Sequence, residues 1–131
     1  MPETLHLPED LRREIFDHCL AAVPNEGCGL FAVDGRDIVA VYPTTNSEQS
    51  PTGYTVPPEQ HLAALEDAES HDWELGGVFH SHPTGSARPS MVDVMGALDP
   101  EWIYLVVGLA GEPAVRAWRI RDREVEEIIL T

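Results

Sequence analysis

Two histidines at the end of an apolar run are the residues of this chain that most clearly predict chemistry. Residues 76–79 read as the start of a buried strand, and His80 and His82 continue it as far as Pro83. Proline has no N–H to donate to a neighbouring strand, so the strand is expected to end there. Alternate side chains of a strand share a face, and both imidazoles therefore point the same way. The pair predicts a metal site at the end of a strand.

A carboxylate, Asp93, follows in the next element. It lies one turn into a helix that is expected to begin at Ser90, a common helix-capping residue type. Asp93 would also complement the dipole at the start of that helix, a role compatible with metal binding. Two neutral nitrogen donors and one carboxylate are the three protein ligands of a catalytic zinc site. A structural zinc site would want a fourth protein ligand, so the pattern predicts one Zn²⁺ held by His80, His82 and Asp93 in an open site.

This spacing of His-x-His, seven residues, then Ser-x-x-Asp resembles the signature of the JAMM (MPN+) zinc metallopeptidase family. In that family a glutamate lies upstream in a Glu-x-Cys-Gly-like context. The residues Glu26-Gly27-Cys28-Gly29 fit that position. The resemblance covers nearly the whole chain and implies that residues 1–131 form a single JAMM/MPN+ domain.

The resemblance also implies catalytic roles for Glu26 and Ser90. Glu26 would take the proton of a metal-bound water and return it to the leaving amine, and Ser90 would stabilise the oxyanion of the tetrahedral intermediate. Both residues have simpler alternatives. Glu26 by itself would be an ordinary loop acid. Ser90 could serve as a helix cap, since one hydroxyl would not readily cap and contact the substrate in a single geometry. Cys28 is expected to be a packed thiol.

Apolar periodicity predicts helices and strands that alternate early in the chain and a meander of strands that closes it. The first helix begins near residues 7–10 and ends at Pro24. A second helix covers residues 58–70 and a short third one residues 91–98. Strands are expected at 27–33, 37–42, 73–82, 102–107, 115–120 and 124–130. The sum is an α/β fold of three layers, in which helices flank a mixed, mostly antiparallel sheet, as the resemblance implies.

Each of the first two helices is expected to turn one stripe of apolar side chains toward the core. Adjacent glycines at 76 and 77 also predict a bulge or a close backbone approach within the central strand. The three histidines at 18, 61 and 71 are expected to be ordinary surface residues. The inward-facing residues of the first two helices are predicted to be Leu11, Ile15, Cys19, Leu20 and Val23, then Leu62, Leu65 and Ala68.

Residues 43–58 are too long and too polar for a simple connection, which favours a functional or mobile segment. Our hypothesis is that this segment, which includes a short piece at residues 53–56, helps to clamp an extended peptide by strand addition. A solvated loop is the alternative. The contacts of Arg88, between the expected metal ligands, are not readable: it could meet a substrate carboxylate or a surface acid.

The charge of the chain limits its partners. There are 23 acids against 8 bases, giving a net charge of −15, and every base is arginine. Nucleic-acid binding is disfavoured because contacts with phosphates need a basic surface. No apolar run is long enough to span a bilayer, the amino terminus does not resemble a signal peptide, and two cysteines do not make a disulfide framework. A cytoplasmic location is therefore expected.

The resemblance implies a substrate class. JAMM enzymes cut the amide bond after the C-terminal Gly-Gly of ubiquitin-like β-grasp proteins. This chain is most similar to prokaryotic members that act on sulfur-carrier proteins, including those that release cysteine from a carrier–cysteine adduct in cysteine biosynthesis. An isopeptidase that removes archaeal ubiquitin-like modifiers from lysines is the alternative within the class. A non-catalytic MPN scaffold is the alternative from another class.

Overall fold

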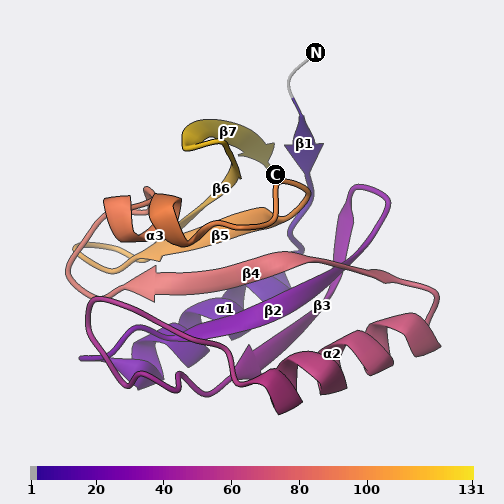
Figure 1. Ribbon diagram of the computed structural model, residues 1–131, viewed down its shortest axis with the longest axis horizontal. Helices are drawn as coiled ribbons and strands as arrows, with labels where there is room; N and C mark the ends of the chain where they lie inside the picture. Colours follow the sequence, from indigo (N-terminus) through magenta and orange to yellow (C-terminus); the bar gives the residue numbers. More distant parts are fainter. Residues whose placement is uncertain (1–2) are drawn as a thin grey trace.

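A seven-stranded sheet forms the centre of the protein, with the strand order β1-β7-β6-β5-β4-β2-β3. The computed structural model describes residues 3–131. In this part of the chain β1 with β7 and β4 with β5 are parallel and all other neighbours are antiparallel, so the sheet is mixed and mostly antiparallel, as predicted. The elements in chain order (Figure 1) are β1 (Thr4–Leu5), α1 (Glu9–Ala22), β2 (Cys28–Asp34), β3 (Asp37–Thr44), α2 (Pro58–Ser70), β4 (Glu74–His82), α3 (Met91–Gly96), β5 (Ile103–Gly108), β6 (Ala114–Arg121) and β7 (Glu124–Leu130).

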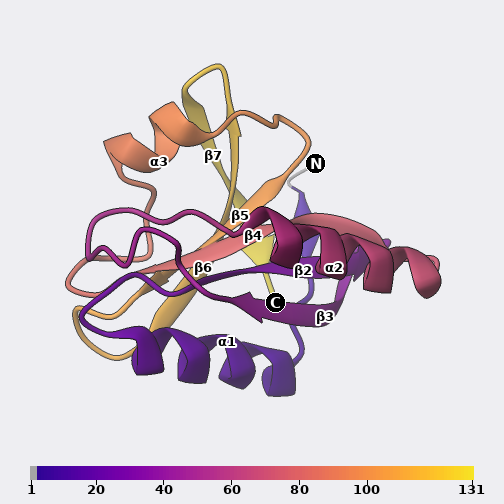
Figure 2. The same ribbon diagram turned by 60° about the horizontal axis from the view of Figure 1, so that its bottom comes forward.

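Helices lie on both faces of the sheet, which confirms the predicted three layers (Figure 2). Helix α1 places Ile15 and Cys19 in an apolar cluster on one face. Helix α2 places Ala64 in a second cluster on the other face, against which Val94 of α3 also packs. The two clusters are separate because the side chains of each strand alternate between them.

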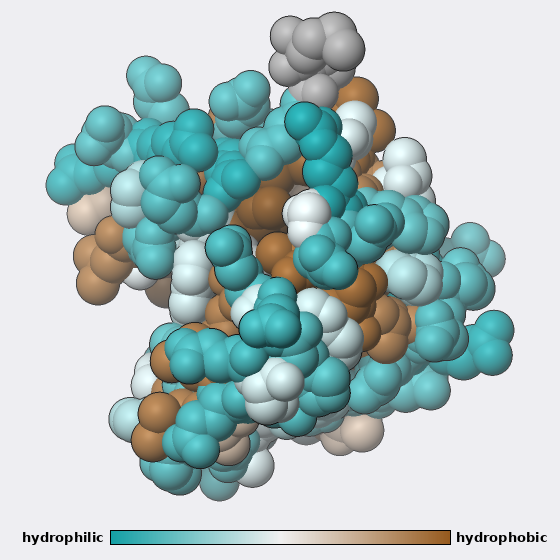
Figure 3. Space-filling view, turned by 90° about the vertical axis from the view of Figure 1, so that its right-hand side faces the viewer, coloured by the Kyte–Doolittle hydropathy of each residue, from teal (hydrophilic) through white to brown (hydrophobic). Residues whose placement is uncertain are grey.

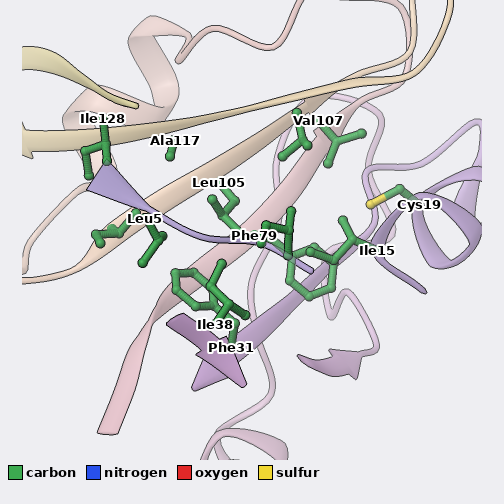
Figure 4. Packing of buried hydrophobic residues seen from close by; sticks show 13 residues of the cluster. Leu5, Ile15, Cys19, Phe31, Ile38, Phe79, Leu105, Val107, Ala117 and Ile128 are labelled. Atoms are coloured by element: carbon green, nitrogen blue, oxygen red, sulfur yellow. The ribbon is translucent and has the colours of Figure 1, made fainter. Parts of the chain in front are cut away.

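Strand β4 is packed on both of its faces, because its neighbouring side chains alternate between the two clusters. Phe79 is fully buried in the first cluster beside Phe31 and Leu105 (Figure 4). Val78 belongs to the second cluster. Burying each large apolar side chain contributes about 1.5–3 kcal/mol, so the strand that carries both histidines is among the most firmly held parts of the molecule. The position of His80 and His82 is therefore set by the core.

The paired glycines of β4 form the predicted bulge. Phe31 of β2 pairs with Gly77, and the next residue of β2 pairs with Leu75, so Gly76 is the extra residue. A Cβ atom at Gly77 would collide with the carbonyl oxygen of Ile103 on β5. Glycine is needed here because β4 and β5 approach too closely for any side chain.

Part of the predicted helix stripes is wrong. Leu20 and Val23 are about half exposed, and Leu62 is 55% exposed. On α2 Ala68 is buried as predicted, Leu65 is partly buried, and Ala64, one turn before Ala68, also faces the sheet. Small side chains let the helix backbone lie close to the sheet, whereas the sequence pattern favours the larger leucines as the buried ones. The close approach of α2 to the sheet therefore determines which of its side chains are buried.

Two further features of the structure differ from the expected elements. Strand β1 was not predicted, because two residues leave no periodic signature and the strand exists through pairing with Ile129 and Leu130 at the far end of the chain. Residues 53–56 form no strand.

Much of the side of the molecule that Figure 3 shows is hydrophilic, in keeping with the acidic composition. Among the described residues no helix is long and apolar enough to cross a membrane.

Candidate metal centre and active site

The two histidines lie at the carboxyl end of β4 and point to the same side of the sheet, as the alternation predicts. His80 is fully buried, while the side chain of His82 is 13% exposed at the rim of the site. Ser81 between them is also buried. Its side chain lies on the opposite face, which follows from the two-residue period of a strand. One imidazole is therefore enclosed by protein and the other is open to solvent.

Asp93 is brought to the histidines by the cap of α3. The backbone N–H of Ser90 donates to Asp93 Oδ2 at 2.9 Å, and Ser90 Oγ accepts from the backbone N–H of Asp93 at 3.2 Å. These two bonds form a reciprocal capping box. The box fixes the rotamer of Asp93 and turns its carboxylate toward β4, where only 6% of the side chain stays exposed.

Three donor atoms converge as the sequence predicts. His80 Nε2 lies 3.0 Å from Asp93 Oδ1, and His82 Nε2 lies 2.9 Å from Asp93 Oδ2. The two Nε2 atoms are 3.3 Å apart. Tetrahedral zinc with bonds of about 2.0–2.1 Å holds its ligand atoms roughly 3.3 Å from one another. The donor set fits a zinc ion, and within residues 3–131 no fourth His, Cys, Asp or Glu belongs to the group.

Hydrogen bonds and burial determine the protonation states of these three side chains and therefore how they can bind a metal. His82 Nδ1 lies 2.9 Å from the carbonyl oxygen of Ser86, which can only accept, so Nδ1 carries a proton and Nε2 is the nitrogen that faces the cluster. Burial lowers the pKa of His80, which keeps that ring neutral. Burial raises the pKa of Asp93, but hydrogen bonds from both histidines outweigh it and leave the pKa well below its ordinary value. The hydrogen bond with Asp93 raises the pKa of His82 in the metal-free protein, so a cation that binds here displaces the proton from His82 Nε2.

Glu26 reaches the site from another part of the chain, between α1 and β2. The next residue, Gly27, donates its N–H to Ser81 Oγ at 2.8 Å, and the N–H of Ser81 donates to the Gly27 carbonyl at 3.0 Å. This pair of bonds joins the Glu26 segment to β4 between the two histidines. Glu26 is 4% exposed, and its Oε1 has no hydrogen-bond partner in the described chain.

The environment of Glu26 suits a proton acceptor. Burial, with a smaller contribution from the charge of Asp93, raises the pKa of Glu26 to about 7, although a proton on His82 opposes the shift. The bonds between Gly27 and Ser81 hold the segment that carries this carboxyl beside the two histidines. A carboxyl with a pKa near neutrality can both accept and return a proton at physiological pH. Glu26 thus has a surrounding that an ordinary loop acid would lack.

Ser90 has the capping role that the sequence left as an alternative, and this does not exclude a second one. Its hydroxyl accepts a hydrogen bond from the Asp93 N–H, which uses a lone pair. A serine hydroxyl also has one hydrogen to donate. Ser90 is exposed, so that hydrogen can point outward from the site. The cap therefore leaves the hydroxyl hydrogen free of the Asp93 N–H, and a contact of Ser90 with substrate stays a prediction.

The polar segment between β3 and α2 is an ordered wall of the site. Tyr54 stacks on the ring of His80, with 4.4 Å between ring centroids and 19° between planes. Burial raises the pKa of the Tyr54 phenol, which keeps it neutral. A cavity of about 670 Å³ extends from Asp93 between this segment and α3, and its walls include Tyr54, Val56, His61, Val92, Leu98 and Trp102. This cavity forms a groove beside Asp93.

The other histidines only partly fit the surface role expected of them. His18 is half-buried, and its Nε2 donates to the carbonyl oxygens of Cys28 and Thr44, each at 3.0 Å. This expectation was wrong, since the histidine joins α1 to the sheet next to Glu26. His61 lines the groove against Trp102. His71 lies on the surface as expected.

Two further expectations are answered by the contacts around the site. Cys28 is a buried thiol beside Thr44, as expected. Arg88 lies over the ring of Trp118, with its guanidinium carbon 5.3 Å from the ring centroid. The indole N–H of Trp118 donates to the carbonyl of Ala87 at 3.0 Å, so this contact holds the loop that joins His82 to Asp93. No signal in the sequence joins Arg88 to Trp118.

Comparison with known proteins assigns the family. A family model described as prokaryotic homologs of the JAB domain matches residues 8–121. A probable TtuB-protein conjugate cleaving protease of Thermus thermophilus is 35% identical over 96% of this chain and 83% of its own length. A desampylase of Haloferax volcanii is 31% identical over 87% of each chain. A CysO-cysteine peptidase of Mycobacterium tuberculosis is 32% identical over 90% of this chain and 84% of its own.

Solved structures agree with the sequence comparison. A protein of Desulfitobacterium hafniense has a TM-score of 0.89 with 35% identity and covers 98% of this chain and 92% of its own. A JAB1/MPN domain protein of Archaeoglobus fulgidus has a TM-score of 0.61 over 99% of this chain and 98% of its own; at 16% identity it supports the fold alone. The chain therefore belongs to the prokaryotic branch of the JAMM (JAB/MPN) family and is a hydrolase.

Proposed function

We propose that this protein is a zinc-dependent peptidase that hydrolyses the amide bond after the C-terminal Gly-Gly of a small ubiquitin-like or sulfur-carrier β-grasp protein. Residues 1–131 are proposed to act as one metallopeptidase domain. The observation that carries the proposal is the convergence of His80, His82 and Asp93, with the buried Glu26 nearby, whose Oε1 has no hydrogen-bond partner among residues 3–131. A three-donor set with an acid nearby is what metal-assisted hydrolysis requires.

Each residue of the site has a separate role in the proposed reaction. Zn²⁺ bound by His80, His82 and Asp93 would supply a Lewis acid and would lower the pKa of water to about 7. Glu26 accepts the proton of the attacking water and gives it to the departing nitrogen, which its pKa near 7 permits. Ser90 donates its free hydroxyl hydrogen to the developing oxyanion. Tyr54 holds His80 from one side and forms the wall of the substrate groove on the other.

The role of Ser90 is separable from its cap. Ser90→Ala is expected to lower kcat by about 10²–10³-fold, which is the usual effect of removing one oxyanion donor. It also removes the cap of α3, which costs about 1 kcal/mol of stability. Ser90→Thr keeps both functions and should restore most of kcat at unchanged zinc content. An alanine variant with the kcat of the unmodified protein would leave Ser90 as a cap alone.

The surface beside the groove suits the folded body of a carrier. Helix α3 has no buried residue, and four large apolar side chains on it or just after it are more than half exposed: Met91, Val92, Met95 and Leu98. Val92 and Leu98 also line the groove. An exposed apolar cluster that continues a binding groove marks an interaction site. A carrier whose tail occupies the groove would bury these side chains.

The names of the relatives supply candidate substrates: TtuB-protein conjugates, the targets of desampylases, and CysO-cysteine. A carrier with cysteine as its leaving group is our first candidate, and a carrier joined to a lysine side chain is the second. All of these place an amide after a carrier tail, so the hydrolytic chemistry is common to them. They differ in the leaving group, which a direct assay can compare.

The test is hydrolysis of CysO-cysteine and of TtuB joined to a lysine, followed by mass spectrometry. We expect cleavage after the tail, loss of cleavage with a zinc chelator, and recovery when zinc is added back. A short tail peptide carrying the same leaving group is the matched comparison, and the intact carrier should have the lower KM because it covers α3. Zinc-loaded protein that cleaves neither conjugate would contradict the proposal.

A further inference from the structure

The segment that contains Glu26 is held mainly by a distant loop and by Ser81, since it precedes β2. The Glu26 N–H donates to the carbonyl of Ser50 at 2.8 Å, and the Glu26 carbonyl accepts from Asn46 Nδ2 at 3.0 Å. Both partners belong to the polar segment between β3 and α2. The Glu26 carboxyl has an oxygen without any hydrogen-bond partner among the described residues, so its position depends on the backbone that carries it.

Asn46 is the central contact of this loop. Its Nδ2 donates to the carbonyls of Glu26 and Gly53, each at 3.0 Å. Its Oδ1 accepts from the backbone N–H groups of Glu48 at 3.0 Å and Thr55 at 3.1 Å. The two donors and two lone pairs of the amide are thus all used. A flipped amide would set donors against donors, so the orientation is determined by the contacts themselves.

The same amide also fixes the aromatic wall of the site. Gly53 and Thr55, which it binds, are the two neighbours of Tyr54, and Tyr54 stacks on His80. One side chain therefore connects the segment of the proton acceptor to the residue that packs on a metal-binding histidine. These two ends are far apart in the sequence and are joined here through a half-buried side chain.

We propose that Asn46 is a positioning residue that sets the Glu26 carboxyl relative to the His80, His82 and Asp93 cluster. The proposal rests on the proposed function, in which Glu26 moves the proton. A displacement of about 1 Å in a reacting group can cost about 10²-fold in rate. Loss of the Asn46 contact frees the Glu26 backbone on one side and loosens Tyr54. The effect is on the rate of the chemical step, because Asn46 is not among the residues that line the groove.

Gln60 offers a matched control. Its side-chain amide fixes the same loop at its start, with Oε1 accepting from the Thr45 N–H at 2.8 Å and Nε2 donating to Thr45 Oγ1 at 2.9 Å. It makes no hydrogen bond to Glu26 or to the residues beside Tyr54. Gln60→Glu and Asn46→Asp make the same chemical change, an amide to a carboxylate, in two supports of one loop.

The experiment measures kcat, KM and bound zinc for Asn46→Asp, Asn46→Ala and Gln60→Glu on a carrier conjugate. Both Asn46 variants are expected to lose about 10²-fold in kcat. Their KM should stay within about threefold and their zinc content should be unchanged, while Gln60→Glu stays within about twofold in kcat. An Asn46 variant with normal kcat, or equal losses in Gln60→Glu, would overturn the proposal.

A double-mutant cycle with Glu26→Gln separates positioning from general loosening. Without the carboxylate there is nothing left to position, so adding Asn46→Asp should change the residual single-turnover rate by less than about twofold. A further 10²-fold loss would show that Asn46 acts independently of Glu26 and would overturn the proposal. If Glu26→Gln alone kept the full rate, the proposed function would fail at its proton acceptor, and a loss in Asn46→Asp would then have another cause.

Discussion

The Glu26→Gln variant is expected to keep its zinc and to lose about 10²–10⁴ in kcat, the usual contribution of a general acid–base residue. Glutamine has nearly the same shape, so the bonds that the Glu26 backbone makes to Ser50 and Asn46 can persist. It cannot accept a proton from water. Zinc content by elemental analysis and single-turnover hydrolysis of a carrier conjugate are the two measurements.

The pH profile gives a second view of the same residue. In the metal-free protein, burial raises the pKa of Glu26 to about 7. Only the ionised carboxylate can accept a proton, so kcat/KM should fall as the pH drops through the pKa of Glu26. A cation bound nearby favours the ionised form and moves this acid limb to lower pH. The residual activity of Glu26→Gln should have no such limb.

Glu112→Gln is the matched control for both measurements, because Glu112 is an exposed acid of the turn before β6. It should leave kcat, zinc content and the pH profile as they are. Turnover by Glu26→Gln at the rate of the unmodified protein would remove Glu26 from the chemistry. Loss of zinc in that variant would instead make it a metal ligand.

The Asp93→Asn variant is expected to lose both zinc and hydrolysis. Its carboxylate lies 3.0 Å from His80 Nε2 and 2.9 Å from His82 Nε2, and it is the one negative donor of the group. Losing a residue that only supports a ligand costs about 10–100-fold in metal affinity. Losing this donor should cost more. Zinc titration against a competing chelator measures the change.

The amide in Asp93→Asn can still accept from the Ser90 N–H, so the cap of α3 should survive. The thermal unfolding midpoint in the presence of chelator should therefore fall little, which separates loss of metal from loss of fold. Asp67→Asn, on the surface of α2, is the control and should leave zinc affinity unchanged. Unaltered zinc affinity in Asp93→Asn would exclude Asp93 from the ligand set.

The sequence by itself determined the local half of the site. His80 and His82 share a face because strand side chains alternate, and Asp93 turns toward them because Ser90 caps the helix three residues earlier. Each relation depends only on neighbours within one strand or one helical turn. The same reasoning predicted the strands that became β2 and β3 and a bulge or close approach at Gly76 and Gly77.

Tertiary structure decided what lies between distant segments. Glu26 was assigned through family resemblance, and its place beside the cluster depends on the bonds between Gly27 and Ser81. The contacts of Tyr54 with His80 and of Asn46 with Glu26 carry no sequence signal. Periodicity predicts which face of an element is apolar but not which segments meet. That choice is made by the packing of the whole sheet, since a side chain such as Asn46 can satisfy its hydrogen bonds only after both segments are in place.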